Sequence, residues 1–180
     1  MSTTPATNFS LPARVLHWTM AVLILAMLFI GVGMVASISE RHEWLVQIHK
    51  PLGIALLVLV VLRLFIRLKR GAPPLPADLP GIQRRLAHLS HLALYLLMFL
   101  MPLIGWSMLS AGGYPVILYG PVLLPPIVPE NPLLFAILRQ AHTYLAFLLF
   151  LTILGHLGAA LYHGLIRRDG VFSSMARGKP

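Results

Sequence analysis

Four long apolar stretches run through this 180-residue chain and decide what it can fold into. They cover about residues 15–36, 45–65, 86–108 and 138–166. A helix needs about 20 residues to cross roughly 30 Å of hydrocarbon, so each stretch is long enough to span a membrane. With 58% hydrophobic and 11% charged residues, the chain could not bury this surface in one soluble core. The sequence therefore predicts an all-α, multi-pass four-helix bundle, with residues 1–180 forming a single membrane domain.

Two segments could be mistaken for something else. The first stretch is uncharged and longer than the apolar core of about 7–15 residues in a signal peptide, so we expect it to remain as a span. Residues 111–132 are apolar but are interrupted by several prolines. An interior proline removes a helix hydrogen bond that lipid cannot replace. We therefore expect an ordered cap over the outer face of the bundle and not a fifth span.

The formal charge of +9 is explained by the flanks of the apolar stretches. The loop between the second and third spans and its borders carry Arg63, Arg67, Lys69, Arg70, Arg84 and Arg85. The basic residues that fall on the same side are Arg14, Arg167, Arg168, Arg177 and Lys179. Such clusters orient helices toward the cytoplasm, which explains the charge without a nucleic-acid partner. We therefore expect both termini to lie in the cytoplasm.

The eight histidines are the residues best suited to chemistry. The chain has no cysteine, which excludes disulfides, iron–sulfur clusters and thiolate metal sites. Because the spans alternate in direction, the histidines separate into two layers. The outer layer contains His42, His49 and His142, and the inner layer contains His17, His88, His91, His156 and His163. His42 falls in the outer loop and is expected to be solvated.

Two histidines of the fourth span have an informative spacing. His142 and His156 are 14 residues apart (156 − 142), which gives roughly 21 Å of rise with both side chains within about 40° of one helix face. The outer one has a partner at similar depth in His49, and the inner one in His17, His88 or His91. Imidazoles from facing helices are what bis-histidine haem ligation needs. Although a lone membrane histidine is usually a packing residue, this pattern predicts two stacked haems.

Other residues have two readings each. Glycines either clear space for a porphyrin or allow close helix packing: Gly31, Gly33, Gly53, Gly105, Gly155 and Gly158. Basic residues either bind haem propionates or only set topology: Arg14, Arg63 and Arg67 for the inner haem, Lys50 and Arg139 for the outer one. The remaining inner histidines, His88, His91 and His163, have either packing roles or a role in quinone and proton handling.

Several segments in this order resemble the bacterial cytochrome b561 family, and within it the short members known as superoxide oxidases. The segments are RVLHW at 14–18, IHKPLGI at 48–54, VLRLFIRLK at 61–69, LAHLSHLALYLLMFLMPLIGW at 86–106 and AHTYLAFLLFLTILGHLGAALYHG at 141–164. The resemblance covers nearly the whole chain and implies a protein of the bacterial inner membrane. It implies two haems b, with His17 and His156 on the inner iron and His49 and His142 on the outer one. The choice of His17 over its rivals comes from the family and not from depth.

The resemblance also implies an activity. The inner face of the family is associated with ubiquinone, which makes His88, His91, His163 and nearby arginines the expected quinone neighbourhood. The expected enzyme is an oxidoreductase that oxidises superoxide, and a positive outer surface would attract this anion. The alternative is a cytochrome b subunit that takes electrons from a redox partner protein such as a hydrogenase or dehydrogenase. A histidine-lined metal transporter is disfavoured, because the apolar interiors of the spans contain no Asp or Glu.

Overall fold

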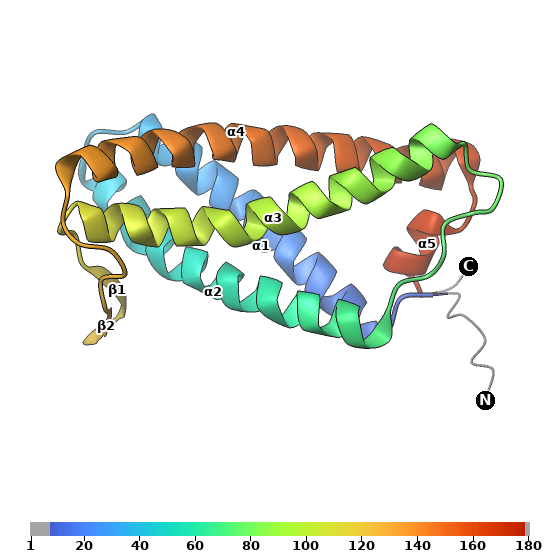
Figure 1. Ribbon diagram of the computed structural model, residues 1–180, viewed down its shortest axis with the longest axis horizontal. Coiled ribbons are helices and arrows are strands. Elements are labelled where there is room, and N and C mark those ends of the chain that lie inside the picture. The colour runs from blue at the N-terminus through green and yellow to red at the C-terminus, as the bar shows by residue number, and fades with distance from the viewer. Residues whose placement is uncertain (1–7, 179–180) are drawn as a thin grey trace.

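The structure is a computed structural model that describes residues 8–178, so Lys179 lies outside the described residues. Its elements are α1 (Leu11–Val35), α2 (Glu40–Arg70), α3 (Gly81–Ala111), β1 (Val116–Tyr119), β2 (Val122–Leu124), α4 (Pro132–Leu161), the π-helix η1 (Tyr162–Arg167) and α5 (Val171–Ala176). The four-helix bundle is confirmed (Figure 1). Its four long helices, the last one continuing to Arg167, are long and apolar enough to cross a membrane.

The helices extend beyond the apolar stretches because their polar ends also favour a helix. Ser39 precedes α2 in an extended conformation, and Glu40 and Glu43 place negative charge in the first turn, where the helix dipole favours it. The last turn of α2 is basic, and Gly71 ends the helix with a φ of 69°. Pro51 lies in the interior of α2.

The same extension corrects the expectation for His42. This residue lies in the first turn of α2, not in a loop. Its Nδ1 lies 2.9 Å from the carbonyl oxygen of Met34, near the end of α1. The side chain therefore links the two helices across their short connection.

The end of α4 is less regular than its start. Pro132 occupies the first turn, and the side chain of Asn131 accepts a hydrogen bond of 2.9 Å from the backbone amide of Leu134. The wider turns of η1 then continue the helix to Arg167. Arg168 has a left-handed backbone conformation, with a φ of 53°, and turns the chain toward α5.

Closely packed helix pairs follow the chain order: α1 packs with α2, α2 with α3, and α3 with α4. The best buried cluster lies between α1 and α2 and contains Met20, Ile24, Leu56 and Val60. Most other apolar side chains face outward, and those of Phe147 and Leu151 on α4 are 65% and 62% exposed. Such a surface suits lipid and would aggregate in water.

Residues between α3 and α4 form an antiparallel hairpin, β1 with β2, in which Val116 pairs with Leu124. The Nζ of Lys50 donates to the carbonyl of Pro115 over 3.2 Å, and the indole of Trp106 donates to the carbonyl of Pro125 over 3.0 Å. Side chains of α2 and α3 thus donate hydrogen bonds to backbone carbonyls of the proline-containing segment. Figure 1 shows this hairpin at one end of the bundle, here called the hairpin end, and α5 at the opposite end, here called the α5 end.

Candidate haem-binding sites

Two imidazoles face each other near the hairpin end. His49 on α2 and His142 on α4 have ring centroids 6.1 Å apart and ring planes inclined by 66°. The Nδ1 atom of His49 is buried and has no hydrogen-bond partner among the described residues, whereas the ring of His142 interacts with the backbone of Met101. Buried polar nitrogens are normally satisfied, so the nitrogens of this pair fit a further group that binds nitrogen.

The separation of the rings fits an iron. Two imidazoles bound on opposite sides of one metal at about 2 Å per bond have centroids about 6 Å apart. The neighbouring helix also leaves room, because Gly105 on α3 faces His142. A Cβ at that position would lie 3.3 Å from the Cε1 atom of His142. Gly105 therefore makes room for a candidate haem ligand. Gly33 instead allows close helix packing, because a Cβ there would lie 3.0 Å from Leu45.

Three imidazoles meet near the α5 end. His17 on α1 and His156 on α4 have centroids 6.2 Å apart and planes inclined by 72°, which nearly repeats the first pair. His91 on α3 approaches the same ring at 5.4 Å and 66°. His88 is exposed on the same helix. Of the three candidate partners of His156 at this depth, only His17 and His91 make a ring contact with it among the described residues.

Helix spacing favours His17 over His91. The first pair joins α2 to α4, and the pair of His17 and His156 joins α1 to α4. Within residues 8–178 neither of these helix pairs is among the closely packed ones, whereas α3 packs closely on α4. A porphyrin needs space between the two helices that ligate its iron. The ring separation of 6.2 Å is also nearer to the expected value than the 5.4 Å separation of His91.

The basic residues proposed for propionates have different surroundings. Arg63 lies close enough to His17 and His156 for electrostatic interaction, and its Nη1 donates to the carbonyl of Ala13 over 3.4 Å. Arg67 interacts electrostatically with His91. Two of the expected positions are therefore beside the inner histidines.

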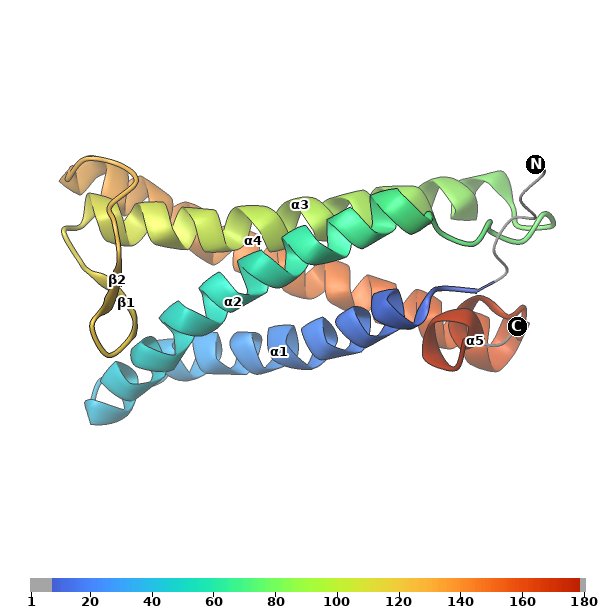
Figure 2. The same cartoon turned by 90° about the horizontal axis from the view of Figure 1, so that it is seen from below.

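The other three basic residues are engaged elsewhere or exposed. Arg14 donates from Nη2 to the carbonyl of Ala176 over 2.8 Å and from Nε to that of Met175 over 3.2 Å, so it holds the end of α5 against α1 (Figure 2). Lys50 is bonded to the hairpin, as described above. Arg139 is exposed on α4 at the hairpin end. This role of Arg14 could not be predicted from the sequence, because α5 is short and not markedly apolar.

An ionic network at the α5 end involves His163. Its Nδ1 lies 2.6 Å from Oδ2 of Asp169, and Nε of Arg167 lies 2.7 Å from the same oxygen. Arg167 also pairs with Asp78, in the connection between α2 and α3, over 2.6 Å. Partial burial alone would raise the pKa of Asp169, but the hydrogen bond from His163, with the Val171 amide and Arg167, lowers it below its ordinary value. The network ties the segment after α4 to the connection between α2 and α3. Among the described residues, no hydrogen bond, ion pair or ring contact joins His163 to His88 or His91.

Comparison with known proteins identifies the family of the chain. The family model described as prokaryotic cytochrome b561 matches residues 8–178. The chain is 33% identical over 162 residues to a protein of Yersinia pestis named probable superoxide oxidase CybB, covering 89% of this chain and 90% of that protein. It is 29% identical over 163 residues to cytochrome b561 homolog 2 of Escherichia coli (strain K12), covering 88% and 86%. It is 27% identical over 171 residues to cytochrome b561 homolog 1 of the same organism, covering 93% and 96%. The chain therefore belongs to the prokaryotic cytochrome b561 family and is a multi-pass membrane electron-transfer protein that binds b-type haem.

Proposed function

We propose that the chain holds two haems b and relays electrons through the membrane from superoxide to ubiquinone. The observation that carries the proposal is the pair of matched imidazole contacts, His49 with His142 and His17 with His156, at 6.1 and 6.2 Å. Both contacts share α4, whose two ligands are separated by roughly 21 Å of helical rise. Two such sites supply electron carriers near both surfaces. When bound, the haems provide the one-electron chemistry, and the protein provides position and electrostatics.

The proposed orientation follows from charge. The basic connection between α2 and α3 and the basic segment after α4 lie at the α5 end, which we assign to the cytoplasm of a bacterial inner membrane. The hairpin end is then the outer face. In this arrangement residues 1–180 act as one membrane domain, with the hairpin covering the outer site.

Superoxide is the proposed donor because the outer end carries positive charge. Lys50 and Arg139 lie on the two helices that bear the outer histidines. A positive surface attracts an anion by electrostatic steering and raises its rate of encounter. The name of the Yersinia pestis relative, a probable superoxide oxidase, supports this donor. Each superoxide gives up one electron and leaves as oxygen.

Ubiquinone is the proposed acceptor at the α5 end. Two electrons and two protons reduce one ubiquinone to ubiquinol, so two superoxide anions are consumed for each quinone. His91 lies beside the inner pair, His88 is one helical turn earlier at the surface, and His163 lies in the network with Asp169. Imidazoles in such positions can hold or transfer the protons that reduction requires.

The decisive experiment is stopped-flow mixing of the purified chain with superoxide. Both haems should be reduced, ubiquinone should reoxidise them, and the association rate should fall as salt rises, because exposed charges are screened beyond about 8 Å at physiological ionic strength. Arg139→Glu is the cleanest variant, since the structure gives its guanidinium no partner among residues 8–178, whereas Lys50→Glu would also break a bond to the hairpin. Arg139→Glu should slow reduction several-fold and leave reoxidation unchanged.

Arg85→Glu is the matched control, because it makes the same charge change on an exposed residue at the α5 end. It should leave reduction by superoxide unchanged. Replacing His88, His91 or His163 should slow reoxidation instead. If superoxide reduces the haems no faster than a neutral reductant of similar driving force and shows no salt dependence, the superoxide role fails. A cytochrome b subunit of a hydrogenase- or dehydrogenase-type complex would then explain the chain better, and a redox partner should copurify from native membranes.

A further inference from the structure

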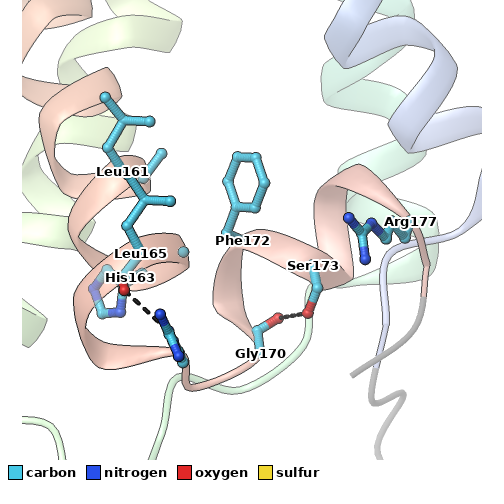
Figure 3. A pocket seen from close by; sticks show the side chains of 10 residues that line it. Leu161, His163, Leu165, Gly170, Phe172, Ser173 and Arg177 are labelled. Carbon is cyan, nitrogen blue, oxygen red and sulfur yellow. Dashed lines mark hydrogen bonds between the residues drawn. The ribbon is translucent and has the colours of Figure 1, made fainter.

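The structure has a cavity outside the candidate haem-binding sites. A cavity of about 360 Å³ lies at the α5 end, between the last turns of the fourth helix and α5. Figure 3 shows Leu161 and Leu165 on one side, Phe172 beside them, and Arg177 at the far end of α5. Arg168 also lines this cavity. It therefore combines an apolar wall with two cationic groups.

Local structure holds the cavity open. Arg168 and Gly170 have positive φ values of 53° and 83°, which reverse the chain after η1 and bring α5 back toward the bundle. Gly164 allows the ring of Phe172 to pack on the helix, since a Cβ there would lie 3.1 Å from the Cγ atom of that ring. Arg14 fixes the last carbonyls of α5. The walls are thus formed by elements that the fold fixes in place.

The charges of the cavity are not neutralised by the protein. The nearby carboxylate of Asp169 is engaged with His163 and Arg167, and the latter also pairs with Asp78. The guanidinium of Arg168 has one hydrogen bond, from Nε to the carbonyl of Leu165. That of Arg177 has no side-chain partner within residues 8–178. No acidic residue is among those that line the cavity. The cavity therefore carries the charge of two exposed arginines.

We propose that this cavity binds the phosphate of an anionic phospholipid. Arginine forms charge-assisted, often bidentate hydrogen bonds with phosphate. The apolar wall continues into side chains that face outward at the end of a membrane span, with Leu165 65% exposed and Ile166 74% exposed. An acyl chain can lie along this surface while the headgroup reaches the arginines, and basic pockets at the cytoplasmic ends of spans suit such lipids. A free phosphate would use only the arginines, so the two sources can be separated by experiment.

The test measures thermal stability of the purified, haem-loaded full chain in mixed micelles of a neutral detergent. Dioleoylphosphatidylglycerol should raise the unfolding temperature saturably, because a ligand that binds only the folded state stabilises it. Dioleoylphosphatidylcholine and inorganic phosphate should not. The Arg168→Gln, Arg177→Gln double variant should need at least about tenfold more phosphatidylglycerol for half of the effect, since each charge-assisted bond contributes substantially to affinity.

Three further variants control the result. Arg85→Gln removes an exposed charge at the same end without touching the cavity and should respond as the parent chain does. Arg177→Gln alone should weaken the lipid effect with little risk to folding, because its side chain makes no bond to the described protein. The Arg168→Lys, Arg177→Lys double variant should recover part of the response.

Several results would overturn the proposal. One is an undiminished phosphatidylglycerol effect in the double Gln variant with its haem spectrum intact. Another is an equal loss in Arg85→Gln, which would reveal general surface charge. Equal stabilisation by inorganic phosphate would make this a free-anion site, and competitive displacement of the lipid by short-chain ubiquinone would make it a quinone site. None of these measurements depends on the electron donor, so the lipid site and the superoxide role can fail separately.

Discussion

A substitution at Gly105 tests whether the histidines at the hairpin end hold a haem. The glycine faces His142 from α3, and a Cβ there would lie 3.3 Å from Cε1 and 3.7 Å from Nδ1 of that ring. Alanine would therefore press on the imidazole by a few tenths of an ångström. A free ring could turn away, but a ring bonded to iron and set against His49 has little freedom. Gly105→Ala should retain the outer haem with a shifted spectrum.

Valine at the same position should have a larger effect. Its two methyl groups extend roughly 1.5 Å beyond the Cβ and would enter the space of the ring. Overpacking of this kind costs about 1–3 kcal/mol in a packed interior. Since about 1.4 kcal/mol corresponds to a factor of ten, the affinity of the outer site for haem should fall roughly 5- to 150-fold. The inner site, with its ligands about 21 Å farther along α4, should be unaffected.

The assay is haem per chain by the pyridine method, together with potentiometric titration of the purified protein. Gly105→Val should approach one haem per chain, and the surviving haem should keep its potential. Gly33→Ala is the matched control, because its Cβ would meet Leu45 at 3.0 Å between α1 and α2 and would have no histidine atom within 4 Å. It should lower thermal stability without selective haem loss. If Gly105→Val retains two haems with unaltered potentials, His142 is not constrained as a ligand and the outer site is wrongly placed.

Three other outcomes are expected. His49→Ala should deplete the outer haem and His17→Ala the inner one, leaving the other potential in place; equal loss of both haems from each variant would contradict two separate sites. Reporter fusions after Gly71 should report the cytoplasm and those after Gly120 the outer side, and a cytoplasmic signal at Gly120 would invert the orientation. Because the pKa of Asp169 lies below its ordinary value, its ionised form stabilises the fold above about pH 4, and this contribution is lost as the pH falls through the lowered pKa. Asp169→Asn should therefore unfold at a lower temperature than the parent at pH 7, and the gap should close on acidification; a gap independent of pH would assign the effect to packing.

The sequence predicted the bundle well because lipid imposes a simple requirement. A span must satisfy all of its backbone hydrogen bonds internally, so length and apolarity locate the helices. Helix ends were less well predicted. Glu40 and its neighbours are polar and fall outside the apolar stretch, yet water at a membrane surface does not prevent a helix from continuing. The β1–β2 hairpin was not predicted, since the prolines that exclude a span do not by themselves specify strand pairing.

The sequence predicted the depth of each histidine in the membrane but not the direction in which its side chain points from the helix. Depth alone left His17, His88 and His91 as partners of His156, because all three lie in the inner layer. Contact between the rings and the spacing of the helices depend on how α1, α3 and α4 are rotated and packed, which apolar spans with little amphipathic pattern do not reveal. The structure supplies those two quantities, and both favour His17.

One helix links the two proposed sites. His142 and His156 both belong to α4, and their spacing is two heptads, so they point to nearly the same side of a continuous helix. Their partners come from different helices, α2 at the hairpin end and α1 at the α5 end. The spacing of His142 and His156 in α4 therefore determines how far apart the two sites lie along that helix, while the packing of α1 and α2 determines how each pair closes.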